Sequence, residues 1–534
     1  MKGKSIHKGQ NMNVSSSRRG FLKGLAGASA FAIGGCKCPF GCQKIKLAAV
    51  GVMGKGYSDW TPMLKSGLVE MVAFCDCDAT MREKAQQRLA KDGINFDMYS
   101  VPFYTDYRKL LDDAGILGID AMTISTPDHA HAPVAIQAMK QGIHVYVQKP
   151  LVRTLWELDS FNRTAQDNGV IVQMGNQGSS LDSMRRCTEV IQSGILGDVK
   201  EVHVWTNRPV WPQGNAVAKW VKDHPKGDPV RMGLNWDAWL ATAEKRPFLD
   251  KYPKNHPGIY DPWNLGSNVY HAFTWRGFFD FGCGAFGDMA CHTMNLAFRG
   301  LELEGVSEAE RMMVDQENDI AFPMKSVVRL TYRARESKVR PGVMLPPVTL
   351  CWYDGYLEGA AGKSGNKPSE EVMADVIASF GEIPNTGCYI VGSKGSVLMQ
   401  DDYGAKCAIK LNGEERFVDV FQHEAAKLVA RSIPFVEGSS AAVAESTVEM
   451  KGFAEGHYME FVRAIRGEGP VYEQTHSRCF SDIEYCIPQM EGILVGCVAQ
   501  RVSGKIAWNP SKLSFDSRAA NNFVTPYIRE GFRF

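Results

Sequence analysis

Short apolar runs alternate with helical patterns through the early part of the chain. The apolar runs at 46–50, 69–75, 119–125 and 170–174 each have the length of one buried strand. A helical pattern covers about 133–140 and is stopped by Gly142, and an amphipathic helical pattern covers 155–169. Strands separated by helices predict an open α/β sheet, in which ligands bind at the carboxyl ends of the strands.

The pattern changes beyond residue 178. An alternating run begins at Val199, and no helix promptly follows any of the later strand candidates at 326–333, 347–353, 388–399 and 406–411. This spacing favours an antiparallel sheet over a parallel one. Helical patterns at 455–466 and 481–502 complete an α+β domain.

Length and composition suit more than one folded domain. The chain has 534 residues, of which 44% are hydrophobic, so it can bury sizeable cores. We expect an α/β domain at 44–178, an α+β domain with an open, mainly antiparallel sheet at 179–510, and a C-terminal tail at 511–534. The formal net charge is +1 and no basic block occurs beyond the N-terminus, so nucleic acid is not an expected partner.

Two long insertions near 209–281 and 341–386 extend the second domain. Segments of this length in compact domains are usually functional or disordered. The first is rich in tryptophan and tyrosine, and arginine, asparagine and histidine stand beside these rings. Flat apolar faces next to hydrogen-bonding side chains suit a carbohydrate, so we predict substrate contacts from Asn207, Arg208, Tyr270, His271, Trp275 and Arg276.

A glycine-rich turn, G-V-M-G-K-G at 51–56, follows the first strand. Glycine permits the tight turn, the close approach of backbone to a pyrophosphate, and the packing of helix on strand that a dinucleotide site needs. Met53 occupies the middle position of that pattern. The next strand ends in Asp76, where a carboxylate accepts the adenosine ribose hydroxyls. Because Asp76 would repel a 2′-phosphate and no arginine follows at 77–78, we predict NAD rather than NADP.

The stretch 124–151 reads I-S-T-P-D-H-A-H-A-P-V-A-I-Q-A-M-K-Q-G-I-H-V-Y-V-Q-K-P-L and places Lys149 at the end of a strand. The order of T-P-D-H-x-H, helix, strand and K-P-L resembles the Gfo/Idh/MocA oxidoreductase family, which includes glucose-fructose oxidoreductase and inositol dehydrogenase. Gln148 stands where the family often has glutamate. The resemblance covers roughly 44–534 and implies a Rossmann NAD-binding domain followed by an α+β domain.

A second motif, G-C-G-A-F-G-D-M-A-C-H-T-M-N at 282–295, resembles the family pattern G-G-x-x-x-D-x-x-x-H. In a helix from about residue 285, the spacing puts Asp288, His292 and Asn295 on one face. The family often has aspartate where this chain has Asn295, which we expect at the substrate. The resemblance places the acid and the histidine beside Lys149, over the nicotinamide.

The resemblance therefore implies a catalytic set of Lys149, His292 and Asp288. Lys149 or His292 would remove the proton of a substrate hydroxyl as hydride leaves the adjacent carbon for NAD, and Asp288 would orient and charge the histidine. The residues expected at the cofactor are Gly51, Met53, Gly54, Gly56, Asp76, Thr126, Pro127, His131, Gln148, Lys149, Asn176 and Gln177.

Three functions fit these residues. The first is an NAD-dependent oxidoreductase that oxidises or reduces a sugar, a polyol or a sugar derivative. The second is a redox-neutral glycosidase, in which oxidation acidifies a C–H bond, the glycosidic bond leaves by elimination, and water addition and re-reduction follow. That route needs one extra base, which Tyr270, His271 or another tyrosine of the insertions could supply. The third is a sugar-binding protein without turnover, against which the intact catalytic set argues.

Residues 1–43 are expected to be an export signal and linker. S-R-R-G-F-L-K at 17–23, followed by a mild apolar run at 24–35, matches a twin-arginine signal. The run is too short for a membrane span, which takes about 20 residues. A small-residue cleavage site at 28–30 and a lipoprotein-like box that would lipidate Cys36 are both present, so we expect a periplasmic or lipid-anchored protein.

The 14 cysteines are scattered. Cys36, Cys38 and Cys42 form a C-x-C-x3-C cluster whose spacing matches no familiar zinc pattern, so no metal is expected. The family resemblance also implies a homo-oligomer, either a dimer or a tetramer.

Overall fold

A computed structural model describes residues 43–253, 256, 259, 268–355, 365–436, 455–472 and 475–534. The twin-arginine motif at 17–23, the apolar run after it, and Cys36, Cys38 and Cys42 lie outside the described residues. No helix within the described ranges is both long enough and apolar enough to cross a membrane.

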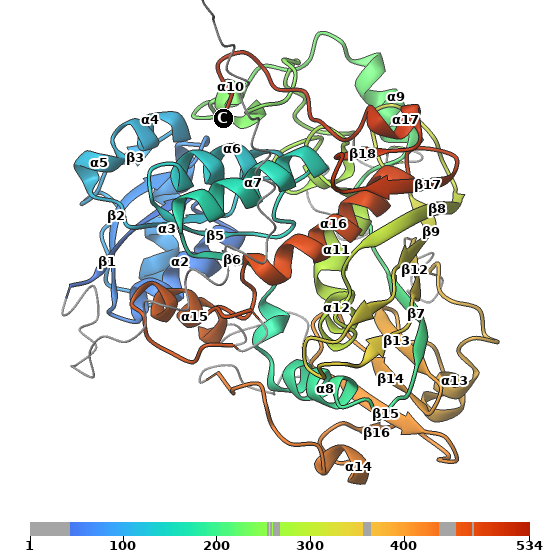
Figure 1. The fold of residues 1–534 in the computed structure, drawn as a ribbon. Helices are drawn as coiled ribbons and strands as arrows, with labels where there is room; N and C mark the ends of the chain where they lie inside the picture. The colour runs from blue at the N-terminus through green and yellow to red at the C-terminus, as the bar shows by residue number, and fades with distance from the viewer. Residues whose placement is uncertain are drawn as a thin grey trace, which may run out of the picture. The chain divides into compact units, whose positions relative to one another are not determined.

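The N-terminal domain is built on a six-stranded parallel sheet in the order β3-β2-β1-β4-β5-β6 (Figure 1). Its strands are β1 (Ile45–Val50), β2 (Val69–Cys75), β3 (Phe103–Tyr104), β4 (Ala121–Ile124), β5 (His144–Val147) and β6 (Val172–Met174). The intervening helices are α2 (Lys55–Lys65), α3 (Thr80–Lys91), α4 (Tyr107–Asp112), α5 (Ala114–Leu117), α6 (Asp128–Met139) and α7 (Leu155–Asn168). The chain order reverses between β1 and β4, and this is where such sheets bind a dinucleotide.

The C-terminal domain contains a ten-stranded sheet in the order β16-β15-β14-β13-β7-β12-β9-β8-β17-β18. Every neighbouring pair is antiparallel except β7 with β12, so the expected α+β domain with a mainly antiparallel sheet is confirmed. The strands are β7 (Val199–Thr206), β8 (Val306–Val314), β9 (Lys325–Tyr332), β12 (Val348–Gly355), β13 (Gly387–Gly392), β14 (Gly395–Met399), β15 (Cys407–Leu411), β16 (Val418–Asp419), β17 (Gly504–Asn509) and β18 (Ser514–Phe515). A separate pair joins β10 (Arg335–Glu336) to β11 (Met344–Leu345).

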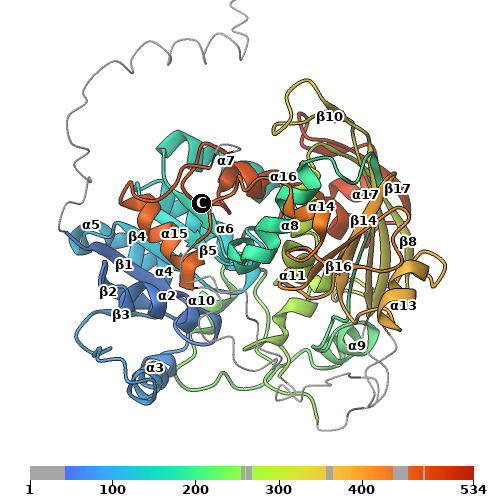
Figure 2. The same ribbon diagram turned by 90° about the horizontal axis from the view of Figure 1, so that it is seen from below.

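Four helices pack against this sheet: α8 (Asp182–Gln192), α11 (Gly284–Thr293), α12 (Asn295–Gly300) and α16 (Ile483–Ala499). Helix α16 also contacts α7 and β6, so it joins the two domains. Figures 1 and 2 both show α11 and α16 between the N-terminal domain and the large sheet. Side chains of β9 and β12 alternate between buried and half-buried, as expected for a sheet whose one face carries the helices.

Two sequence-based expectations about elements need correction. The run 388–399 is not one strand, because Ser393 and Lys394 between two glycines turn the chain and separate β13 from β14. Helix α6 begins at Asp128 rather than near 133, and Pro133 lies inside it, where the proline removes one backbone N–H donor from the helix.

The remaining helices lie in the connecting segments and at the C-terminal side of the chain. They are η1 (Gln177–Ser180), α9 (Asn215–Asp223), α10 (Trp236–Leu240), η2 (Thr274–Gly277), α13 (Ala374–Phe380), α14 (Glu424–Lys427), α15 (Glu455–Ile465) and α17 (Arg518–Asn521). After α17 the tail returns to the N-terminal domain, where the Trp156 N–H donates to the Val524 carbonyl at 3.0 Å and Phe532 stacks under Arg108.

Candidate functional site

At Gly51 and Gly56 the glycine-rich turn after β1 has room for backbone only. A Cβ on Gly51, whose φ is 85°, would lie 2.4 Å from the Ser125 carbonyl oxygen. A Cβ on Gly56 would lie 2.0 Å from the Gly51 carbonyl oxygen. Helix α2 starts at Lys55, within this turn, so the N–H groups at the start of the helix lack helical partners there. Such an arrangement is suited to binding a pyrophosphate.

Asp76 lies at the end of β2 and holds the turn from the side. Its carboxylate accepts hydrogen bonds from the Val52 N–H at 3.0 Å and from the Asp78 N–H at 3.1 Å. Burial raises the pKa of Asp76 to about 6, although these two N–H groups act in the opposite direction. A carboxylate at this strand end is in the position that a dinucleotide fold uses for the ribose hydroxyls.

Polar groups without partners lie at two other strand ends of the same sheet edge. Both amide atoms of the fully buried Asn176, after β6, lack a hydrogen-bond partner among the described residues. The Thr126 hydroxyl, after β4, is buried and likewise lacks a partner within the described ranges. Buried polar atoms are normally satisfied, so unpaired ones at a ligand-binding edge indicate where a ligand would supply the partner. The turn, Asp76 and these two residues together fit a dinucleotide.

A charged cluster is centred on Asp288, in the middle of α11. Lys149, at the end of β5, donates from Nζ to the Asp288 backbone oxygen at 2.8 Å and to its Oδ1 at 2.9 Å. Arg276 donates from Nε to the same Oδ1 at 3.0 Å. Burial opposes ionisation, but Lys149 and Arg276 outweigh it and hold the pKa of Asp288 well below its usual range. Asp288 is therefore a carboxylate that fixes the ammonium group of Lys149.

His292 lies one turn after Asp288 and is 3% exposed. Burial and the nearby charge of Lys149 lower its pKa well below the usual value, so the imidazole is neutral at physiological pH. Its Nδ1 has no hydrogen-bond partner in the part of the chain that the structure describes. The expectation that Asp288 orients and charges this histidine is corrected, because the Asp288 carboxylate accepts hydrogen bonds from Lys149 and Arg276 instead.

Asp59, in the first turns of α2, is a buried centre of hydrogen bonds that the sequence pattern does not reveal. Its carboxylate accepts hydrogen bonds from Lys55 at 2.6 Å, from the Ser125 hydroxyl at 2.7 Å and from the Gln148 amide at 2.9 and 3.0 Å. Tyr458 of α15 also donates to it at 3.0 Å. Gln148 itself is uncharged, but Asp59 supplies a negative charge at this strand end.

Lys55, in the glycine-rich turn, contacts Tyr458 and Gln177. Burial opposes its charge, but Asp59 and Tyr458 together raise the pKa of Lys55 above its usual value. With the Gln177 amide oriented to satisfy both of its partners, its oxygen accepts from Lys55 at 2.5 Å and its nitrogen donates to the Gly175 carbonyl at 2.8 Å. The positive charge of Lys55 contributes to the lowered pKa of His292, so the cofactor turn and the histidine are electrostatically linked.

The C-terminal sheet contributes a further group of polar residues. Arg208, just after β7, donates to Asn207 and, at 3.1 Å, to Asp402 in the loop between β14 and β15. The next residue of that loop, Tyr403, packs its ring edge-on against His292 with the centroids 4.7 Å apart. Arg208 also contributes to the lowered pKa of His292. The sequence pattern did not identify this loop as part of the site. It lies far along the chain from the Rossmann domain, and only the folded structure shows that the two meet.

One of the predicted substrate residues does not lie at this cluster. Tyr270 is 1% exposed and packs among Trp236, Trp239, Phe278 and Phe281 as part of an aromatic core. The assignment of Tyr270 is therefore corrected, because packing of the insertion encloses its ring. His271 is half-buried and interacts with Arg231, and the Trp275 ring lies 4.3 Å from the Arg276 guanidinium, so these two assignments stay predictions. Of the predicted set, Asn207, Arg208 and Arg276 remain at the site.

Asn295 and His131 are corrected for a different reason. Helix α11 ends at Thr293, so Asn295 opens α12 and leaves the face of Asp288 and His292. The Asn295 amide donates to Ser179 at 3.0 Å and accepts from Tyr485. His131 is fully buried between the Pro150 and Thr126 carbonyls, at 2.7 and 2.9 Å, so it fixes the two strand ends and does not face a ligand.

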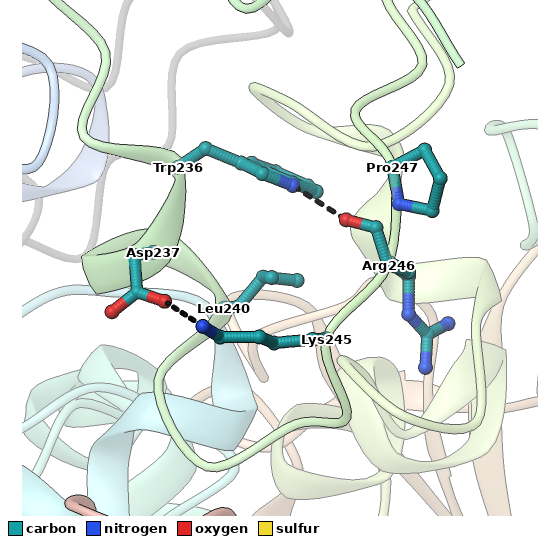
Figure 3. A pocket seen from close by; sticks show the side chains of 6 residues that line it. All are labelled: Trp236, Asp237, Leu240, Lys245, Arg246 and Pro247. Carbon is teal, nitrogen blue, oxygen red and sulfur yellow. Dashed lines mark hydrogen bonds and ion pairs between the residues drawn. The ribbon is translucent and has the colours of Figure 1, made fainter. Parts of the chain in front are cut away.

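A hollow of about 430 Å³ lies elsewhere, in the aromatic insertion. Figure 3 shows its lining, with Trp236 on one side and the paired Asp237 and Lys245 on the other. The Trp236 indole donates to the Arg246 carbonyl at 2.9 Å. None of the residues that line this hollow belongs to the cluster of Lys149, Asp288 and His292, so it is separate from the site described above.

Comparison with known proteins identifies the N-terminal domain. Residues 45–176 match the family model described as "Oxidoreductase family, NAD-binding Rossmann fold", GFO_IDH_MocA. The N-terminal domain belongs to the Gfo/Idh/MocA family. The match includes the glycine-rich turn, Asp76 and Lys149, so the family assignment covers the cofactor residues and the lysine of the cluster.

Curated relatives align with part of this chain. Glycosyl hydrolase family 109 protein 2 of Akkermansia muciniphila is 28% identical over 174 residues, which cover 31% of this chain and 34% of that protein. The 2,7-anhydro-N-acetylneuraminate hydratase of Mediterraneibacter gnavus is 27% identical over 108 residues, 20% of this chain and 28% of that protein. The aligned part thus spans about a third or less of the length of these relatives.

Solved structures share the fold over most of the chain. An inositol dehydrogenase homolog from Azotobacter vinelandii, complexed with NADH and myo-inositol, aligns with a TM-score of 0.53 and 15% identity over 88% of this chain and 98% of that one. Levoglucosan dehydrogenase, complexed with NADH and levoglucosan, aligns with a TM-score of 0.50 and 13% identity over 87% and 99% of the two chains. At these identities the likeness establishes the two-domain fold.

Proposed function

We propose that the protein is an NAD-dependent oxidoreductase that acts on a hydroxyl group of a sugar, a polyol or a sugar derivative. The observation that carries this proposal is the cluster of Lys149, Asp288 and His292 at the carboxyl edge of the dinucleotide-binding sheet. A fixed ammonium group and a neutral imidazole at that edge are the groups that a hydroxyl needs for proton removal. The solved structures with myo-inositol and levoglucosan support a carbohydrate as the substrate.

The residues present fit NAD. The turn at 51–56 and the start of α2 would hold the pyrophosphate, Asp76 the adenosine ribose, and Asn176, Gln177 and Thr126 the other end of the cofactor. Met53, Gly54, Pro127 and Gln148 complete the expected lining. When bound, NAD supplies a hydride acceptor at the nicotinamide ring.

Lys149 and His292 have different parts in the proton transfer. Because Asp288 accepts from Lys149 through both a carboxylate and a backbone oxygen, the lysine Nζ has a fixed position. His292 is neutral, so it can accept the proton of a substrate hydroxyl without first losing one. Asp288 stays ionised and paired with Arg276 while the proton moves to His292.

A second candidate function is a redox-neutral glycosidase that uses tightly bound NAD. The observation in its favour is the similarity to glycosyl hydrolase family 109 proteins, including an alpha-N-acetylgalactosaminidase of Shewanella oneidensis that is 29% identical over 29% of this chain and 34% of that protein. An exported enzyme without a partner to recycle NADH suits a cycle that restores its own cofactor.

The test uses the purified full-length protein. We expect denaturation to release NAD, identified by mass spectrometry, and we expect NADH absorbance when the protein is mixed with a panel of free sugars and polyols without added cofactor. A dominant NADP signal, or no nucleotide and no binding of added NAD, would refute the cofactor assignment. No absorbance change with any member of the panel, with or without added NAD, would refute the oxidation.

We also propose that the chain is exported by the twin-arginine route and resides in the periplasm or at the cell envelope, with Cys36 as the residue that would carry a lipid. The R-R motif at 18–19 supports this proposal, and the route carries folded proteins, so NAD can be acquired before export. A homo-oligomer, a dimer or tetramer, is proposed on the family resemblance. Light scattering of the purified protein gives the oligomeric state directly.

A further inference from the structure

Tyr403 is placed at the reaction site by a rigid loop between β14 and β15. The Asp401 carboxylate accepts hydrogen bonds from four consecutive backbone N–H groups, 403–406, at 2.7 to 3.2 Å. Asp402 is held by the Thr386 hydroxyl at 2.6 Å and by Arg208 at 3.1 Å. A loop fixed at successive residues does not need to reorganise when a substrate binds, so the Tyr403 ring has a defined position.

The surroundings of Tyr403 are those of the catalytic cluster. Its ring lies edge-on against His292, with 4.7 Å between the centroids. Its phenol is influenced by the charges of Asp402, Arg208, Asp288 and Lys55, which come from both domains. Backbone of the N-terminal half also approaches it closely, because a Cβ on Gly178 would lie 2.4 Å from the Tyr403 carbonyl oxygen. Tyr403 therefore belongs to the same site as Lys149 and His292.

We propose that Tyr403 is a third proton-transfer residue of this site, which donates its phenolic proton to the oxygen that leaves when a glycosidic bond is cleaved. The proposal rests on the proposed function, because the cleavage follows oxidation of a neighbouring hydroxyl. It gives the redox-neutral route an acid, in addition to the base that this route requires. Tyr270 is enclosed in the aromatic core, and His271 interacts with Arg231 away from His292.

The count of protons leads to this assignment. Oxidation of the hydroxyl needs one proton acceptor, which the neutral His292 provides, whereas Lys149 is an ammonium donor bound by Asp288. Because the pKa of His292 is well below its usual value, the imidazole passes that proton to water and is neutral again. Elimination next to the new carbonyl then breaks a C–H bond, whose proton goes to His292 and whose electron pair forms a C=C bond. The C–O bond breaks, its electron pair stays on the leaving oxygen, and that oxygen takes the phenolic proton of Tyr403. When water adds to the double bond, its hydroxyl joins the carbon that lost the leaving group, its other proton returns to the phenolate, and His292 returns a proton to the neighbouring carbon.

The protonation state of Tyr403 agrees with a donor role. Burial and the neighbouring Asp402 raise the pKa of the phenol to about 12, so it carries its proton near neutral pH. A neutral phenol is a hydrogen-bond donor toward an oxygen that gains negative charge. His292, whose pKa is lowered, serves as the acceptor beside it. The two adjacent rings thus have environments that separate their roles as acid and base.

The test compares Tyr403→Phe with wild type on two glycosides of the same sugar that differ in the leaving group. The probes are para-nitrophenyl N-acetyl-α-galactosaminide with its methyl counterpart, followed by a panel of other matched glycoside pairs. A nitrophenolate needs little help from an acid, whereas an alkoxide needs much. We expect the variant to lose about 10² to 10⁴ in kcat on the methyl glycoside, the usual range for a positioned acid, and far less on the nitrophenyl glycoside.

Tyr270→Phe is the matched control, because it removes a hydroxyl from a buried tyrosine outside the site and should leave both rates unchanged. Bound NAD and the melting temperature of both variants should equal those of wild type. An equal loss on the two leaving groups, or no loss, would overturn the role of Tyr403. Wild type that reduces its NAD with free sugars but cleaves neither kind of glycoside would also overturn it, while the proposed oxidation stands. Absence of both activities would refute the proposed function itself.

Discussion

Gln148→Glu should destabilise the protein in a pH-dependent way, because it places a second carboxylate against Asp59. The Gln148 amide nitrogen lies 2.9 and 3.0 Å from the two Asp59 carboxylate oxygens. The side chain cannot swing away toward the next strand, since even a Cβ on Gly175 would lie 2.6 Å from this amide. The substitution therefore replaces a hydrogen bond by a repulsive contact at the end of β5, one residue before Lys149.

The introduced glutamate can either ionise beside Asp59 or keep its proton, and the loss of stability is set by whichever state costs less free energy. Two full charges about 3 Å apart repel by about 6 kcal/mol at an effective dielectric constant of about 20. Holding a glutamic acid protonated at pH 7 instead costs about 4 kcal/mol, from an ordinary pKa of about 4.3. The introduced carboxyl therefore keeps its proton, because Asp59 is the carboxylate that is ion-paired with Lys55. Its O–H takes over the hydrogen bond that the amide donates to Asp59 in wild type, so the net loss stays at about 4 kcal/mol at pH 7.

The sign with pH follows from linkage. The pKa of the introduced carboxyl is raised in the folded state, so above about pH 4.3 the unfolded chain loses this proton first. The penalty therefore grows by about 1.4 kcal/mol per pH unit above that point, until the pH reaches the folded-state pKa. Thermal unfolding of variant and wild type, recorded side by side, should show a small difference at about pH 5 and a larger one at about pH 8.

The matched control is the exchange of the two groups in one chain, Asp59→Asn with Gln148→Glu, which restores one amide and one carboxylate at the same contact. We expect the double variant to recover most of the lost melting temperature and to lose the added pH dependence. A pH-independent loss in the single variant, or a double variant no more stable than the single one, would refute the reasoning.

Two further predictions concern other parts of the chain. Lys149→Ala should abolish turnover on the substrate found in the sugar panel while mass spectrometry still detects bound NAD, because the turn at 51–56 and Asp76 lie at other strand ends; loss of the nucleotide would contradict the separate roles. Arg18→Lys with Arg19→Lys should leave the protein in the cytoplasm with full activity in lysates, as fractionation with an activity assay would show, and normal delivery of this variant outside the cytoplasm would contradict the twin-arginine signal.

The fold was predictable where the hydrophobic pattern was strong. In the N-terminal domain the apolar runs predict β1, β2, β4 and β6, and the helical patterns predict α6 and α7. The short β3 and helices α3 to α5 were not predicted. In the second domain β9 and β12 follow from apolar runs. β8 and β17 were missed, because both carry charged or exposed residues at several positions. The hairpin of β13 and β14 was read as one strand, since its turn spans only a few residues.

The site was predictable only where its residues follow local spacing. Lys149 lies at a strand end, and Asp288 and His292 lie four residues apart on one helix, so the sequence placed all three. Asp59 and Tyr403 could not be predicted, because each acquires its role from contacts that no spacing encodes, with Tyr458 in one case and His292 in the other. Tyr270 failed for the opposite reason. A sequence cannot show whether an aromatic ring packs inside an insertion or faces a ligand.

The charges at the site are only partly compensated. Lys55 is paired with Asp59 and Arg208 with Asp402. Lys149 and Arg276 share the single carboxylate of Asp288, so this cluster keeps one net positive charge. A fixed positive charge stabilises negative charge that develops on a nearby oxygen. The cluster therefore suits a hydroxyl-bearing substrate, because a substrate oxygen gains negative charge as its proton moves to the neutral His292.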